Sequence, residues 1–131
     1  MHTLIDNTQQ NCQIGWHIPN RVLQVSIVGV YTPQNATHVN AKLLEVLNKV
    51  EQPLMLLMDC SAMLRPANFE TTRHEQAFMH HPMLSQIYVA SNDRLVRFSM
   101  MVIFNASSAA FRVFDSIGQA RIMIEALIGK R

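Results

Sequence analysis

The chain has 131 residues, of which 49% are hydrophobic and 15% are charged, and its formal net charge is +2. These values are typical of one ordinary globular domain, and the scattered lysines and arginines argue against nucleic-acid binding. The first residues, MHTLIDNTQQN, lack the basic start and apolar core of a signal peptide, and the longest apolar runs are far shorter than the ~20 residues of a spanning helix. We therefore expect a cytoplasmic protein without a membrane span.

The first predicted element is a β-hairpin. Strands are expected at 13–18 and 22–31, joined by Pro19-Asn20, a pair that suits the centre of a type I turn. Residues 1–12 are expected to be an extension, followed by a single domain over 13–129.

A helix is predicted to begin at Pro33, with Thr32 as its N-cap. Apolar residues then recur at three- and four-residue steps, which is typical of a helix that faces a core: Ala36, Val39, Leu43, Val46, Leu47 and Val50.

The run PLMLLMD follows. Because it is short and apolar without alternation, it indicates a strand at 54–58 that is covered on both faces in the centre of a parallel sheet.

The second half of the chain continues this alternation of helix and strand. A thin apolar stripe indicates a weaker helix at about 68–81, and QIYVA indicates a strand at 86–90. Ser91-Asn92 are expected to cap a helix that begins near Asp93. The last strand is predicted at 111–114, and Ser-Ile-Gly-Gln from Ser116 matches the capping box of a final helix. The predicted fold is α/β, with the order β-β-α-β-α-β-α-β-α and a single mixed, mostly parallel five-stranded sheet with flanking helices.

This order, the segment LLMDCS at the end of the central strand and the ending FRVFDSIGQARIMIEAL together resemble the STAS group, the domains of anti-sigma-factor antagonists and their SpoIIAA-like relatives. The resemblance extends from Gln13 to Leu127. It implies a small α/β regulator that binds a protein partner. The SpoIIAA-like branch is also similar in shape to lipid-carrying CRAL-TRIO domains, which implies a possible apolar ligand.

Members that are switched by phosphorylation carry Asp-x-Ser at the central strand and, several residues later, Asp-Ser-x-Gly with the acceptor serine. Asp59 and Ser61 match the first part, but no serine occurs in the segment 67–70 where the second part should fall. The resemblance therefore extends to the fold and to partner binding, and not to the phosphorylation switch.

Polar residues near the ends of the predicted parallel strands form a candidate crevice or switch: Asp59, Cys60, Ser61, Ser91 and Asn92. Ligands of open α/β sheets bind at the carboxyl ends of the strands. The same residue types also cap helices, and we favour capping and strand exit over a crevice.

The sequence predicts no catalytic, cofactor or metal site. Cys60 has no nearby base to activate it, and His74, His80 and His81 lack the spacing of zinc ligands. A Gly-rich phosphate loop, a nucleophile elbow and a paired-carboxylate motif are also missing from the sequence. We therefore predict that the protein is not an enzyme.

The segment LVRFSMMVIF predicts a helix that is apolar nearly all the way round. Such a helix is either deeply buried or covered by a partner, and both readings stay open. The candidate interface residues are Leu95, Phe98, Met101, Val102 and Phe104. The sequence thus favours a non-catalytic regulatory or protein-interaction domain that acts as a homodimer or with a partner. The alternative is a small apolar-ligand or lipid binder with a cavity beneath this helix.

Overall fold

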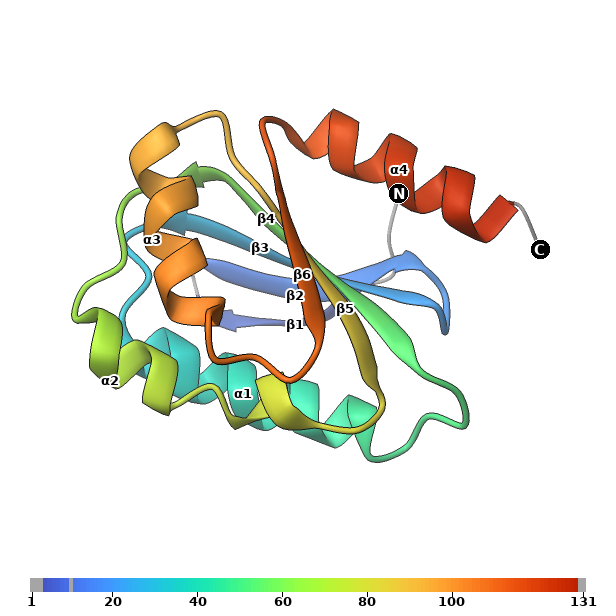
Figure 1. Ribbon diagram of the computed structural model, residues 1–131. Coiled ribbons are helices and arrows are strands. Elements are labelled where there is room, and N and C mark those ends of the chain that lie inside the picture. The colour runs from blue at the N-terminus through green and yellow to red at the C-terminus, as the bar shows by residue number, and fades with distance from the viewer. Residues whose placement is uncertain (1–3, 10, 130–131) are drawn as a thin grey trace.

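The computed structural model describes residues 4–9 and 11–129, with side chains over 11–129 (Figure 1). One six-stranded sheet contains all strands in the order of the sequence: β1 (Leu4–Gln9), β2 (Cys12–Ile18), β3 (Val22–Gly29), β4 (Leu54–Met63), β5 (Leu84–Ala90) and β6 (Ala110–Phe114). The helices are α1 (Pro33–Leu47), α2 (Phe69–His74), the 3₁₀ helix η1 (Ala77–His80), α3 (Arg94–Phe104) and α4 (Ile117–Gly129).

The predicted fold class is confirmed. Strands β1, β2 and β3 pair antiparallel, β3 to β6 pair parallel, and β4 lies in the middle of the sheet as expected. The structure adds one strand to the predicted five, because β1 lies within the segment 1–12 that we expected to be an extension. Its sequence, LIDNTQ, is polar after the first two residues and lacks the apolar alternation by which strands are recognised.

The hairpin turn between β2 and β3 differs from the predicted type. The Arg21 amide donates to the Ile18 carbonyl at 3.0 Å, which closes a four-residue turn with Pro19 and Asn20 at its centre. Asn20 has a φ of 63°, whereas the third residue of a type I turn has a φ near −90°. The positive angle is that of a type II turn, and asparagine is one of the few residues that adopt it readily.

The start of α1 is as predicted, since the Thr32 hydroxyl accepts from the Asn35 amide and the Asn35 side-chain oxygen accepts from the Thr32 amide, both at 3.1 Å.

The helix predicted at 68–81 is instead divided into α2 and η1. Between them the buried Gln76 accepts a hydrogen bond of 2.6 Å from the Tyr31 hydroxyl. Helix α2 therefore ends just before Gln76, whose side chain reaches into the core.

The sheet has a separate hydrophobic core on each face. Helices α1, α2 and α3 share one face because each parallel crossover moves in the same direction across the sheet and crossovers are right-handed. On the other face α4 packs Ala120 and Ile124 against Val22, Leu57 and Tyr88. Figure 1 shows α4 on the opposite side of the sheet from α1 and α2. In the described part of the chain no helix is both long and apolar enough to cross a membrane.

Candidate functional site

The sequence predicts that a strand ends at Asp59, Cys60 and Ser61. This prediction is wrong, because β4 continues to Met63. The pairing of β3 with β4 shifts between Asp59 and Ala62, where three steps on β4 match two on β3. This bulge is stabilised locally, since the carboxylate of Asp59 accepts from the Ser61 amide at 3.1 Å and from the Ser61 hydroxyl at 2.6 Å. The two polar side chains thus shape the strand rather than cap a helix.

Cys60 lies inside the core between the sheet and α1, α2 and α3, which we call the first core, and has no exposed surface. Burial, with the Asp59 carboxylate as a second cause, raises the pKa of its thiol far above the usual value. A thiol that stays protonated is a poor nucleophile. Cys60 therefore does not line a crevice, and its environment is that of a buried apolar residue.

Ser91 and Asn92 precede α3, but the N-cap of that helix is Asp93. The Asp93 carboxylate accepts from the amides of Leu95 at 2.8 Å and Val96 at 3.3 Å, and the Ser91 hydroxyl accepts from the Asp93 amide at 3.1 Å. Ser91 is fully buried and Asn92 is exposed. The prediction that Ser91-Asn92 cap α3 is therefore wrong, because the cap is the next residue along the chain and Ser91 supports it by accepting from its amide.

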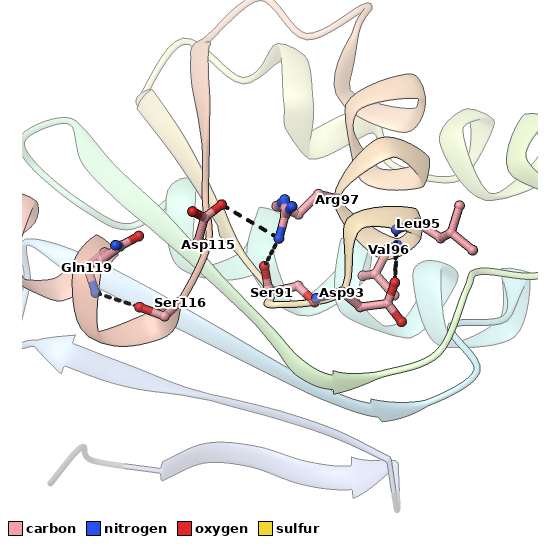
Figure 2. A network of polar contacts seen from close by, with 8 residues as sticks. All are labelled: Ser91, Asp93, Leu95, Val96, Arg97, Asp115, Ser116 and Gln119. Atoms are coloured by element: carbon pink, nitrogen blue, oxygen red, sulfur yellow. Dashed lines mark hydrogen bonds and ion pairs between the residues drawn. The ribbon is translucent and has the colours of Figure 1, made fainter.

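Arg97 links the ends of β5 and β6, as Figure 2 shows. Its guanidinium donates to the Ser91 carbonyl at 2.8 Å and lies 3.6 Å from the carboxylate of Asp115. Close by, the Ser116 hydroxyl accepts from the Gln119 amide at 3.1 Å and begins α4 in the predicted manner. The hydroxyls of Ser91 and Ser116 at these two strand ends therefore each help to organise a helix start.

The two halves of the candidate crevice do not form one cluster. Asp59 pairs with Ala90 in the sheet, so it lies one residue from Ser91 along the neighbouring strand. Yet Asp59 bonds to Ser61, whereas Ser91 bonds to Asp93 and Arg97. These hydrogen bonds support strand and helix geometry.

Two of the three histidines considered as metal ligands, His80 and His81, have separate partners. His80 Nδ1 lies 2.8 Å from the Ser108 hydroxyl, and His81 Nε2 lies 2.7 Å from the side-chain oxygen of Asn48. Within residues 4–9 and 11–129 no group of three or more potential ligand side chains comes together.

Helix α3 has one buried side and one exposed apolar side. Val96, Met100, Ile103 and Phe104 lie in the first core, whereas Leu95, Phe98 and Met101 are 56, 61 and 45% exposed. Phe104 is thus wrong as a candidate interface residue. Its ring packs near those of Phe78 and Phe111, with centroids 6.3 and 6.4 Å away, because the last turn of α3 lies over the sheet.

The exposed side of α3 forms one wall of an apolar hollow whose other wall is β6. The hollow has a volume of about 510 Å³ and is lined by Arg94, Leu95, Arg97, Phe98, Met101, Val113 and Asp115. A second hollow of about 280 Å³ continues along α3, and Val102 and Phe111 contribute to it. We call the two together the α3–β6 hollow. It joins four of the predicted interface residues, Leu95, Phe98, Met101 and Val102, to a strand that sequence reasoning did not connect with them.

Val113 is one of the residues of this hollow that sequence reasoning missed, as is Phe111. A valine in a short strand gives no sign of which helix it faces, because this depends on where β6 joins the sheet. Arg94 and Arg97 had a weak signal, since they are the charged residues within the first turn and a half of an otherwise apolar helix. A further hollow of about 540 Å³ lies at the opposite end of the sheet, near Trp16 and Val50, away from every predicted site residue.

A mixed sheet of this order, with α1, α2, η1 and α3 on one face and α4 on the other, defines a small α/β domain. The structure is similar to the crystal structure of an uncharacterised protein from the DUF3478 family with a SpoIIAA-like fold, from Shewanella loihica. The two chains are 14% identical, the match covers 94% of each, and the TM-score is 0.63. The chain therefore has a SpoIIAA-like fold, as the sequence resemblance implied.

No family model matches the sequence, and no curated protein matches it either.

Proposed function

We propose that this protein is a non-catalytic regulatory domain that acts by protein association, as a homodimer or with a partner protein, through the exposed side of α3. The observation that carries the proposal is the exposure of Leu95, Phe98 and Met101 next to one another on a helix whose other side is fully buried. Contiguous exposed apolar side chains with a polar rim are typical of protein interfaces. Arg94, Arg97 and Asp115 supply that rim.

The experiment is size-exclusion chromatography with light scattering at tens of micromolar protein. We expect the wild-type protein to be a dimer and Met101→Glu to be a folded monomer, because an unpaired charge is not tolerated in a dry contact. Ile122→Glu is the matched control. Ile122 is also apolar and 70% exposed, but it lies on α4, across the sheet from α3. A monomeric wild type would exclude the homodimer, and loss of the dimer in both variants would show that the effect is not local to α3.

A small apolar ligand is the second candidate function, and the α3–β6 hollow favours it. Its larger part, about 510 Å³, has the volume of a small-molecule site. The space beneath α3, where we expected a cavity, is occupied by Val96, Met100 and Ile103. Native mass spectrometry of the purified protein distinguishes the two functions, since a bound ligand adds its own mass to a monomer and a homodimer doubles the mass of the chain.

A further inference from the structure

We infer that β6 is itself part of the contact between two copies, which pair their β6 edges antiparallel and join two six-stranded sheets into one. This inference rests on the proposed homodimer and specifies its geometry. In this dimer the α3–β6 hollow of one copy faces the α3–β6 hollow of the other copy and is covered by it.

Contact area is the first argument. Leu95, Phe98 and Met101 are each about half exposed. Since a large side chain presents on the order of 200 Å² when fully exposed, these three offer roughly 300 Å². A stable interface of standard size needs about 800 Å² from each partner. A contact made by α3 alone is therefore too small, and the surface that continues from it through Val113 is the edge of β6.

The second argument is the direction of the backbone groups in β6. The Phe114 carbonyl accepts from the Ser91 amide at 3.2 Å, so Phe114, Arg112 and Ala110 direct their backbone groups toward β5. By alternation, Phe111 and Val113 direct theirs away from the sheet. An edge strand with such outward groups is a template for pairing with another strand. The side chains of the same two residues line the α3–β6 hollow.

The two edges of the sheet differ in regularity. The pairing of β1 with β2 contains two register shifts, and irregular pairing of this kind protects an edge from further strands. The pairing of β6 with β5 runs through five consecutive residue pairs without a shift. The regular edge is the one beside the exposed apolar side of α3.

Charge excludes one register of the pairing, and a favourable side-chain contact supports another. A two-fold axis at Arg112 would place this arginine opposite Arg112 of the second copy, and like charges directly opposite are destabilising. An axis at Val113 instead places Arg112 opposite Phe114 of the second copy. Within one chain the guanidinium of Arg112 already lies 5.3 Å from the centroid of the Phe114 ring, so the two side chains are suited to contact. This register also brings Phe98, which lines the hollow beside Val113, close to the axis.

The test is Val113→Pro, with Val113→Thr as its matched control. Proline removes an outward N–H that β5 does not use, and an edge strand tolerates proline at such a position. Threonine keeps both the shape and the N–H. By sedimentation equilibrium we expect the dissociation constant to rise at least about tenfold for Val113→Pro, because two backbone hydrogen bonds across the axis are lost, and much less for Val113→Thr.

A second measurement uses the unmodified protein. Amide hydrogen exchange is compared above and below the dissociation constant, and we expect the amides of Phe111 and Val113 to be protected only in the dimer. A dimer in which these amides exchange freely, and which Val113→Pro does not weaken, would overturn the edge pairing and leave the α3 contact in place. A wild-type protein that stays monomeric at tens of micromolar would overturn the homodimer itself.

Discussion

The two adjacent methionines of α3, Met100 and Met101, should lose very different amounts of stability on the same substitution. Met100 has no exposed surface, whereas Met101 is 45% exposed. Alanine at either position removes three side-chain groups, each worth about 0.8 kcal/mol when fully buried. For Met100 this gives about 2.5 kcal/mol, and the cavity left in a close-packed core raises the loss into the range of about 2–5 kcal/mol.

For Met101→Ala we expect a loss of about 1 kcal/mol or less, because roughly half of the side chain is already in water and no closed cavity forms. The assay is urea unfolding at roughly 1 µM protein, so that association does not add to the measured stability. Equal losses for the two variants would contradict this account, since they would mean that α3 is rotated from its described position or that its exposed side is covered within the monomer. Repeating the assay at tens of micromolar then measures how much association contributes.

Three further predictions concern the sheet. Leu56→Ala, in the central strand, should lower the free energy of unfolding by about 2–5 kcal/mol, because Leu56 is buried in the first core; a loss below about half a kcal/mol would contradict that position. Ser61→Ala should cost less than about 1 kcal/mol, since an exposed hydroxyl is lost and the Ser61 amide still bonds to Asp59; a larger loss on urea unfolding would mean that the bulge depends on the hydroxyl. Burial raises the pKa of Cys12 from 9.0 to about 11 and that of Cys60 further, so both thiols should resist a thiol reagent at pH 8 until the protein unfolds. Because the unfolded chain loses these protons first, the free energy of unfolding should fall as the pH rises from about 9 toward 11, and a flat profile would contradict the burial of Cys12.

Much of the fold could be predicted because several of its elements have a clear sequence pattern, either a periodic apolar stripe or a short continuous apolar run. The stripe of α1 with its Thr32 cap, and the apolar run of β4, each have one structural interpretation. The end of β4 could not be predicted in the same way. Asp59 and Ser61 interrupt the apolar run, and only the pairing with β3 keeps the strand going past them. The polar strand β1 was missed for a similar reason, since its pairing with β2 rather than its sequence defines it.

The candidate site could be predicted from the sequence only in part, and for a different reason. Arg94 and Arg97 lie on the same side of α3 as Met101, but this pattern is weak and does not assign Phe104 to the core. The position of the sheet decides this, because whichever side of α3 meets β5 and β6 becomes the buried one. The sequence could therefore identify α3 as unusual but could not tell which of its residues remain at the surface.

The sequential order of the six strands has a consequence for how the chain folds during synthesis. Every strand pairs with the strand that precedes it along the chain, so each can add to a sheet that has already left the ribosome. Three of the five pairings are parallel, however, and each joins strands that are separated by a helical connection, so the sheet does not have the local topology that favours rapid folding. Until β6 and α4 emerge, the edge of β5 and the buried Tyr88 on its face have no cover. The interval between the synthesis of β5 and that of α4 is therefore the stage at which a stalled or truncated chain is most prone to aggregate.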